Sequence, residues 1–116
     1  MNKKLETLVS IIVPCYNQGI YLNEALESVW LQSFLKWECI IVDDGSKDNS
    51  EEVLQSFCFS DNRFKFFKRP SHIEKGVNSC RNYGFKLSKG EYIQWFDSDD
   101  IMHPNKLKNL IELLVN

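Results

Sequence analysis

Short apolar runs alternate with amphipathic helical patterns along this chain, and the alternation leaves few folds open to it. The run from Val9 to Val13 is rich in β-branched residues and is followed by Pro14, so it predicts a buried strand that stops there. From Ile20 to Leu31, apolar residues recur at helical spacing. This pattern predicts an amphipathic helix that covers the first strand.

The same alternation repeats three more times. Further strands are predicted at 37–42, 63–68 and 91–96, and further helices at 49–57, at 77–87 and from about Pro104 onward. Gly90 is expected to end the helix at 77–87 as the glycine just beyond it. The order β-α-β-α-β-α-β-α predicts an α/β fold with an open, mainly parallel sheet and right-handed crossovers. With 116 residues, the chain is expected to form one domain over residues 1–116.

Composition narrows the function classes. The net charge is -2 and no basic stripe is present, which argues against a nucleic-acid partner. The four cysteines form no CxxC pair, so neither a zinc site nor a dense disulfide framework is expected. The apolar run near the N-terminus is too short for a signal peptide or a membrane span. We therefore expect a reduced, cytoplasmic chain.

Polar residues gather where three predicted strands end. These clusters are Pro14–Asn17, Asp43–Ser46 and Asp97–Asp100. In open α/β sheets, ligands bind outside the carboxyl ends of the strands, so the clusters should meet at one edge. The segment WFDSDD, residues 95–100, places three carboxylates within four positions, and their mutual repulsion would be relieved by a divalent cation. Mg²⁺ typically takes one or two protein carboxylates and completes its shell with water and phosphate.

Four motifs in order carry a resemblance to a known family. They are IIVPCYN, IIVDDGSKDNS, CRNYGFKLSKGEYIQWFDSDD and the helix near Pro104. Together they resemble the N-terminal half of family-2 glycosyltransferases, inverting enzymes of the GT-A fold, over nearly all of residues 8–116. The resemblance implies a Rossmann-like sheet with flanking helices, here truncated, and a site for a nucleotide-diphosphate sugar.

The resemblance also implies roles for single residues in nucleotide binding. Pro14 and Tyr16 would lie beside the base, with the Tyr16 ring stacked on it. Asp44, with Asp43, would accept hydrogen bonds from the base or the ribose. Arg81 matches the arginine that the family has in the helix before its DXD strand.

The pair Asp97 and Asp99 matches the DXD motif itself. The resemblance implies that both carboxylates bind Mn²⁺ or Mg²⁺, with Asp99 as the direct ligand and Asp97 also close to the nucleotide. Independently of the family, a divalent cation suits a diphosphate leaving group, because it stabilises the charge that grows as the glycosidic bond breaks.

The activity implied by the resemblance is sugar transfer, with inversion, from a donor such as a UDP-sugar to a hydroxyl of a glycan or lipid-linked acceptor. Family members place the general base after the DXD motif, so it is expected beyond residue 116, and polysaccharide biosynthesis is a compatible process. A full-length relative would act peripherally at the inner membrane face. The sheet edge that the missing half would cover is expected to favour self-association.

Other interpretations stay open. The chain would serve as an inert binding or interaction module if only the fold were retained. A receiver domain also binds Mg²⁺ in an acidic pocket, but its acidic pair should end the first strand, where Pro14 stands. A dehalogenase-type phosphatase would carry its D-x-D at the start of the domain. Asp48 and Asp100 are expected to cap or turn the chain, Lys75 is a candidate phosphate contact, and His72 and His103 have no ligand pattern.

Overall fold

The computed structural model describes residues 6–115, and the predicted alternation of strands and helices is confirmed there. The elements are β1 (Val9–Cys15), α2 (Gly19–Trp30), β2 (Trp37–Asp43), α3 (Ser50–Ser60), β3 (Phe64–Lys68), α4 (Val77–Leu87), β4 (Tyr92–Trp95) and α5 (Lys106–Val115).

The four strands form one sheet in the order β3-β2-β1-β4, and all neighbouring strands are parallel. The predicted parallel α/β sheet is therefore confirmed. Strands β1 and β2 lie in the middle and are buried throughout, as their continuous apolar runs require. Their register pairs Val9 with Trp37 and Cys15 with Asp43, so the two strands end side by side.

The expectation that the first strand stops at Pro14 is wrong, because β1 continues to Cys15. Pro14 still pairs with Val42 on the β2 side. On the other side, the pairing of β1 with β4 ends at Ile12 and Trp95. Ile12 O accepts from Phe96 N, so the backbone polar groups of Ile12 point toward the β4 side. Because orientation alternates along a strand, the backbone of Pro14 points to the same side as that of Ile12. The missing N–H of Pro14 therefore falls where no ladder bond is needed.

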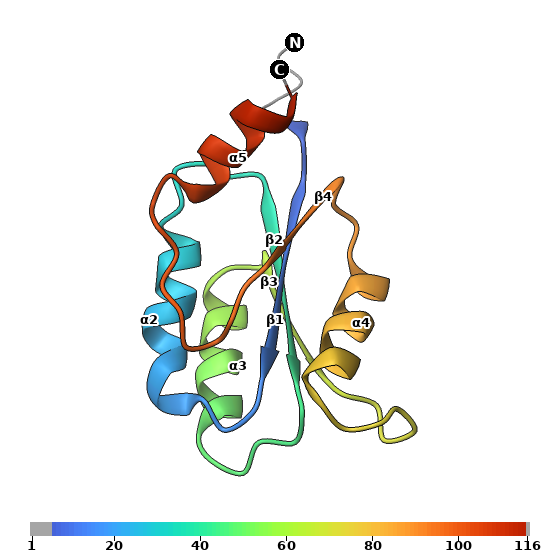
Figure 1. Cartoon of the computed structure of the whole chain (residues 1–116). Helices are drawn as coiled ribbons and strands as arrows, with labels where there is room; N and C mark the ends of the chain where they lie inside the picture. The colour runs from blue at the N-terminus through green and yellow to red at the C-terminus, as the bar shows by residue number, and fades with distance from the viewer. Residues whose placement is uncertain (1–5, 116) are drawn as a thin grey trace.

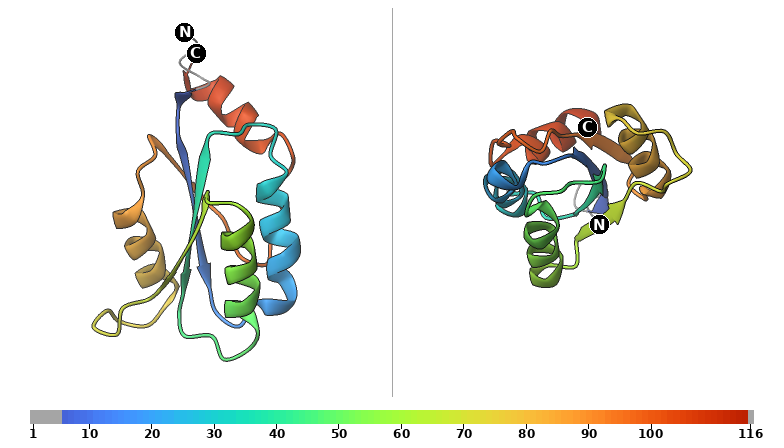
Figure 2. Two further views of the ribbon diagram at one scale, coloured as in Figure 1. Left: turned by 180° about the vertical axis from the view of Figure 1, so that it is seen from behind. Right: turned by 90° about the horizontal axis from the view of Figure 1, so that it is seen from below.

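The helices lie on both faces of the sheet. Helices α2 and α3 cover one face and α4 covers the other, while α5 lies on the α2 side near the amino ends of the central strands (Figures 1 and 2). The larger core lies under α2, α3 and α5, and a smaller one, including Ile40, Val42 and Cys80, lies under α4. Gly84 lets α4 approach closely, since a Cβ there would lie 2.7 Å from Cγ2 of Ile12.

Gly90 does not end α4 in the way the sequence suggested. The helix ends at Leu87, its C-cap Ser88 is extended, and Gly90 is not among the residues with positive φ. The glycine is needed for packing instead. A Cβ at this position would lie 2.5 Å from Ser10 Oγ and 2.7 Å from the Ser10 backbone nitrogen.

A buried carboxylate fastens the amino ends of three strands. Glu38 accepts hydrogen bonds from Ser10 Oγ at 2.6 Å, Lys65 Nζ at 2.9 Å and the Lys89 backbone N–H at 2.7 Å. Burial alone acts to raise the pKa of Glu38, but these donors together hold it below its ordinary value. The charged form is therefore the one that the fold stabilises.

Both outer strands leave an edge of the sheet open. Strand β3 carries Lys65 and Lys68, which pair with Glu38 and Glu51, while the short β4 contains no charged residue. Self-association through such an edge stays a prediction. Within residues 6–115, the helices are all too short or too polar to cross a bilayer.

We predict that Glu38→Gln destabilises the fold by about 1–3 kcal/mol at pH 7, because it removes the charge that three buried or half-buried donors share. The folded-state pKa is lowered, so this contribution is present above the ordinary glutamate pKa of 4.5 and is lost as the pH falls below it. Urea denaturation should show a gap between wild type and variant that narrows between pH 7 and pH 3.

Glu51→Gln is the matched control. Its pair with Lys68 also reaches strand β3 but is exposed, with 46% and 67% of the two side chains accessible. Exposed pairs contribute little, so this variant should be indistinguishable from wild type. Two results would contradict the stabilising role of the Glu38 charge. One is an equal loss of stability in the two variants, and the other is a stability difference between wild type and Glu38→Gln that widens in acid.

Candidate functional site

The polar strand ends surround one cleft of about 420 Å³. Pro14 and Tyr16 line it from the end of β1, Asp44 from the end of β2, and Asp97 and Asp99 from the segment after β4. The structure thus brings together three clusters that are far apart in the sequence. This meeting follows from the register, since β1 pairs with both β2 and β4.

The loops after β1 and β2 are tied to one another. Asn17 adopts a left-handed φ of 51°, its N–H donates to Ser46 Oγ at 2.8 Å, and its Oδ1 accepts from Lys47 N at 2.8 Å. Asp48 accepts from the Gly19 N–H at 3.0 Å, at the start of α2. These bonds fix the backbone on the C-terminal side of Tyr16. The sequence analysis expected Asp48 to cap or turn its own segment, and Asp48 does accept from the Ser50 N–H at 3.0 Å, at the start of α3. The bond from Asp48 to α2 and the bonds of Asn17 and Ser46 were not predicted.

Asp43 does not line the cleft. Its side chain turns into its own loop, where it accepts from the N–H groups of Gly45 and Ser46 at 3.1 and 2.8 Å and from the Ser46 hydroxyl. Gly45 has a φ of 97°, which favours glycine at this turn. These bonds show that Asp43 shapes the turn, and its contact with the nucleotide stays a prediction.

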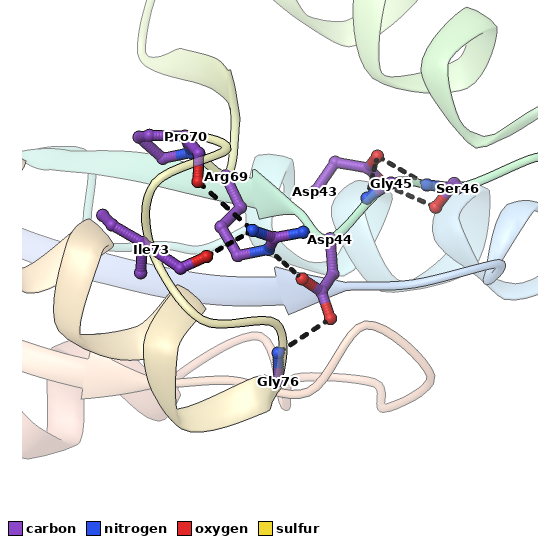
Figure 3. Close-up of polar contacts among 8 residues, drawn as sticks. All are labelled: Asp43, Asp44, Gly45, Ser46, Arg69, Pro70, Ile73 and Gly76. Atoms are coloured by element: carbon purple, nitrogen blue, oxygen red, sulfur yellow. Dashed lines mark hydrogen bonds and ion pairs between the residues drawn. The ribbon is translucent and has the colours of Figure 1, made fainter.

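Asp44 anchors the loop that forms one wall of the cleft. Oδ1 accepts from Arg69 Nε, and Oδ2 accepts from the Gly76 N–H at 3.1 Å (Figure 3). Arg69 also donates to the carbonyl oxygens of Pro70 and Ile73 at 3.2 and 2.5 Å, so it closes the segment 69–76 on itself. The sequence analysis did not identify Arg69, because no local pattern signals a contact across 25 residues.

Tyr16 lies at the mouth of the cleft with 41% of its surface exposed. Its ring is therefore available to a planar ligand, although the ammonium of Lys75 lies 4.3 Å from the ring centroid. Tyr16 is thus not a core residue.

The two DXD carboxylates differ in their contacts. Asp97 Oδ1 lies 3.4 Å from Arg81 Nη2, in a loose and largely exposed pair. Within residues 6–115, no hydrogen bond or ion pair of the Asp99 side chain is present, although Asp99 lines the cleft. Asp100 instead accepts from the Ile101 N–H at 2.9 Å, in its own turn.

Arg81 lines a second cleft, of about 400 Å³, which shares Asp97 with the first. The Arg81–Asp97 pair therefore stands between the two clefts. The structure places Arg81 next to Asp97, while its role in nucleotide binding stays a prediction.

The cysteines near the cleft are not nucleophiles. Burial and the charge of Asp43 raise the pKa of Cys15 to about 12, and burial with the charge of Asp44 raises the pKa of Cys80 to about 11. Both thiols therefore stay protonated at neutral pH. Both side chains are buried and pack as small apolar residues.

The carboxylate pair has the chemistry of a hard-cation site. Within the described part of the chain, no group of three or more ligating side chains is present, so a cation would need ligands beyond the protein. Two carboxylates with one loose partner between them suit Mg²⁺ or Mn²⁺ completed by phosphate and water oxygens. The residues present fit such an ion.

A family model described as "Glycosyl transferase family 2" matches residues 10–116. The chain belongs to this family. It is 39% identical, over 93% of its length, to the glycosyltransferase GlyG of Streptococcus pneumoniae, and it spans 35% of that protein. It is also 38% identical over 93% of its length to the Escherichia coli enzyme WfgD, named UDP-Glc:alpha-D-GlcNAc-diphosphoundecaprenol beta-1,3-glucosyltransferase, and spans 41% of it.

Solved structures agree with this assignment. The crystal structure of Staphylococcus aureus TarS 1-349 in complex with UDP-GlcNAc superimposes with a TM-score of 0.82 at 28% identity. The match covers 92% of this chain and 31% of that chain. The predicted family and the predicted GT-A type of sheet are thus confirmed, and the chain corresponds to about a third of these longer family members.

We predict that Arg69→Met destabilises the protein by about 1–3 kcal/mol, because it leaves the buried Asp44 carboxylate with one partner fewer. The side chains of Arg69 and Asp44 are only 16% and 10% exposed. Urea denaturation measures the loss, and amide hydrogen exchange should show faster opening at Gly76.

Arg81→Met provides the control from the neighbouring cleft. Its pair with Asp97 is longer, at 3.4 Å, and the side chains are 36% and 62% exposed. Stability should therefore stay at the wild-type value. If Arg69→Met were equally harmless, Asp44 would not depend on Arg69.

Proposed function

We propose that this chain provides the donor-binding part of a sugar-nucleotide-dependent glycosyltransferase and that its donor is a UDP-sugar. The observation that carries the proposal is the single cleft that combines Tyr16, Asp44, Asp97 and Asp99 at the carboxyl ends of a parallel sheet. Membership of glycosyl transferase family 2 supports it. The UDP donor is supported by the name of WfgD and by the UDP-GlcNAc complex of TarS.

Tyr16 and Asp44 would bind the uridine. The exposed ring of Tyr16 offers an apolar face on which a base can stack. Asp44 offers a carboxylate acceptor, which suits the imide N–H of uracil or a ribose hydroxyl. Both Asp44 oxygens already accept one bond each, yet a carboxylate has about four acceptor positions, so capacity remains. Pro14 completes the wall beside the base.

Asp97 and Asp99 would hold Mn²⁺ or Mg²⁺ near the diphosphate. When bound, such an ion supplies Lewis-acid stabilisation of the leaving diphosphate. Asp99 has the less committed carboxylate of the two, so we assign it as the direct ligand. Arg81 lies within 3.4 Å of Asp97 and adds positive charge on the same side of the cleft.

The transfer step is the part that these residues do not complete. Inverting displacement needs a base to deprotonate the acceptor hydroxyl, and we place that base and the glycan or lipid-linked acceptor site outside the described cleft. Donor binding is therefore the activity to test on the chain itself.

The test is isothermal titration of UDP into the chain, with Mn²⁺ and with EDTA. We expect binding in Mn²⁺ and a loss of at least about tenfold in affinity in EDTA, because an ion held by Asp97 and Asp99 would offset the negative charge of the diphosphate. Asp99→Asn should bind UDP in Mn²⁺ as weakly as wild type does in EDTA.

Asp100→Asn is the matched control, since Asp100 is adjacent, acidic and exposed but bonds only within its turn. It should keep the wild-type affinity. Binding of UDP that ignores both metal and Asp99 would refute the metal assignment alone. A wild-type chain that binds neither UDP, GDP nor dTDP with metal would refute the donor site and favour the inert module.

A further inference from the structure

Negative charge dominates the cleft. Three carboxylates line it, from Asp44, Asp97 and Asp99. A nucleoside diphosphate is itself a polyanion, so a site with this lining needs cations of its own to accept one. The contacts of the basic side chains near the cleft, within residues 6–115, show which of these side chains is available to bind a diphosphate.

Among residues 6–115, the side chains of three basic residues contact residues that line the cleft, and two of the three already have carboxylate partners. Arg69 is paired with Asp44, and Arg81 is loosely paired with Asp97. The third is Lys75, for which no carboxylate lies within ion-pair distance in the described part of the chain. Its ammonium lies 4.3 Å from the centroid of the Tyr16 ring.

The backbone beside Lys75 is held at the rim of the cleft. The N–H of the next residue, Gly76, donates to Asp44 Oδ2 at 3.1 Å. Gly76 has a φ of 140°, a conformation that other residues rarely adopt, so the path of the chain from Lys75 into α4 is fixed (Figure 3). The lysine backbone is therefore held close to the cleft, and its ammonium lies over the Tyr16 ring at the mouth of the cleft.

We propose that Lys75 is a binding residue for the diphosphate of the nucleotide donor. The inference rests on the proposed function and adds a residue to it. In the free protein the ammonium rests on Tyr16, and when a base stacks on that ring the ammonium moves to the phosphate oxygens. An exposed cation–π contact is weaker than charge-assisted hydrogen bonds to phosphate, so the exchange is favourable.

The test compares UDP with uridine in Mn²⁺, by ¹⁵N-HSQC titration, on wild type, Lys75→Met, Lys75→Arg and Lys47→Met. Lys75→Met should bind UDP about tenfold more weakly, because the diphosphate loses its partner. It should bind uridine no more weakly than wild type does, because the base no longer displaces an ammonium from the Tyr16 ring. The UDP affinity of Lys75→Met should also depend less on salt. Lys75→Arg should restore most of the affinity for UDP.

Lys47→Met controls for net charge, since Lys47 is exposed on the neighbouring loop, and it should match wild type. If Lys75→Met lost affinity for UDP and uridine equally, the proposal would be overturned. Lys75 would then position Tyr16 or contact the base. Unchanged UDP binding would overturn the proposal outright. If wild type bound neither UDP nor uridine, the proposed function and this inference would both be refuted. That result differs from a loss confined to Lys75→Met. Circular dichroism would check that each variant is folded.

Discussion

The parallel register of β1 with its two neighbours is the constraint on which the site depends. Cys15 lies opposite Asp43, and Ile12 lies opposite Trp95, so three chain segments leave the sheet at one edge. A one-residue slip would reverse the faces of a strand and move its terminal polar residues. Buried apolar runs on β1 and β2 make such a slip costly, so the hydrophobic core also sets the geometry of the cleft.

Sequence periodicity predicted the order and type of the elements because it depends only on local pattern. The predictions failed for residues whose role depends on a contact with a part of the chain distant in sequence. Gly90 resembles a helix terminator, yet its need for glycine comes from Ser10, 80 positions away. Pro14 resembles a strand terminator, yet it is tolerated because the pairing of β4 has ended beside it. Such contacts have no signature in the neighbouring sequence.

In the candidate site, too, some residues could be predicted from local sequence and others could not. Tyr16, Asp44, Asp97 and Asp99 could be selected from motifs, and the structure places them around one cleft. Asp43 matched the same pattern but faces its own turn. The roles that motifs did not predict are those of residues that position others. Arg69, which holds Asp44, lies outside every motif, and Asn17 and Ser46 lie inside the motifs but their role in joining two loops was not predicted.

The electrostatics of the cleft explain why the DXD pair is the point where a cation would bind. Asp44 is matched by Arg69 in a largely buried pair, so its charge is already balanced. Asp97 has only a long contact with Arg81, and among the described residues Asp99 has no ion pair. The uncompensated charge thus lies at the end of the WFDSDD segment. A divalent ion would balance both these carboxylates and the diphosphate, whereas a monovalent side chain such as Lys75 could balance only part of the ligand.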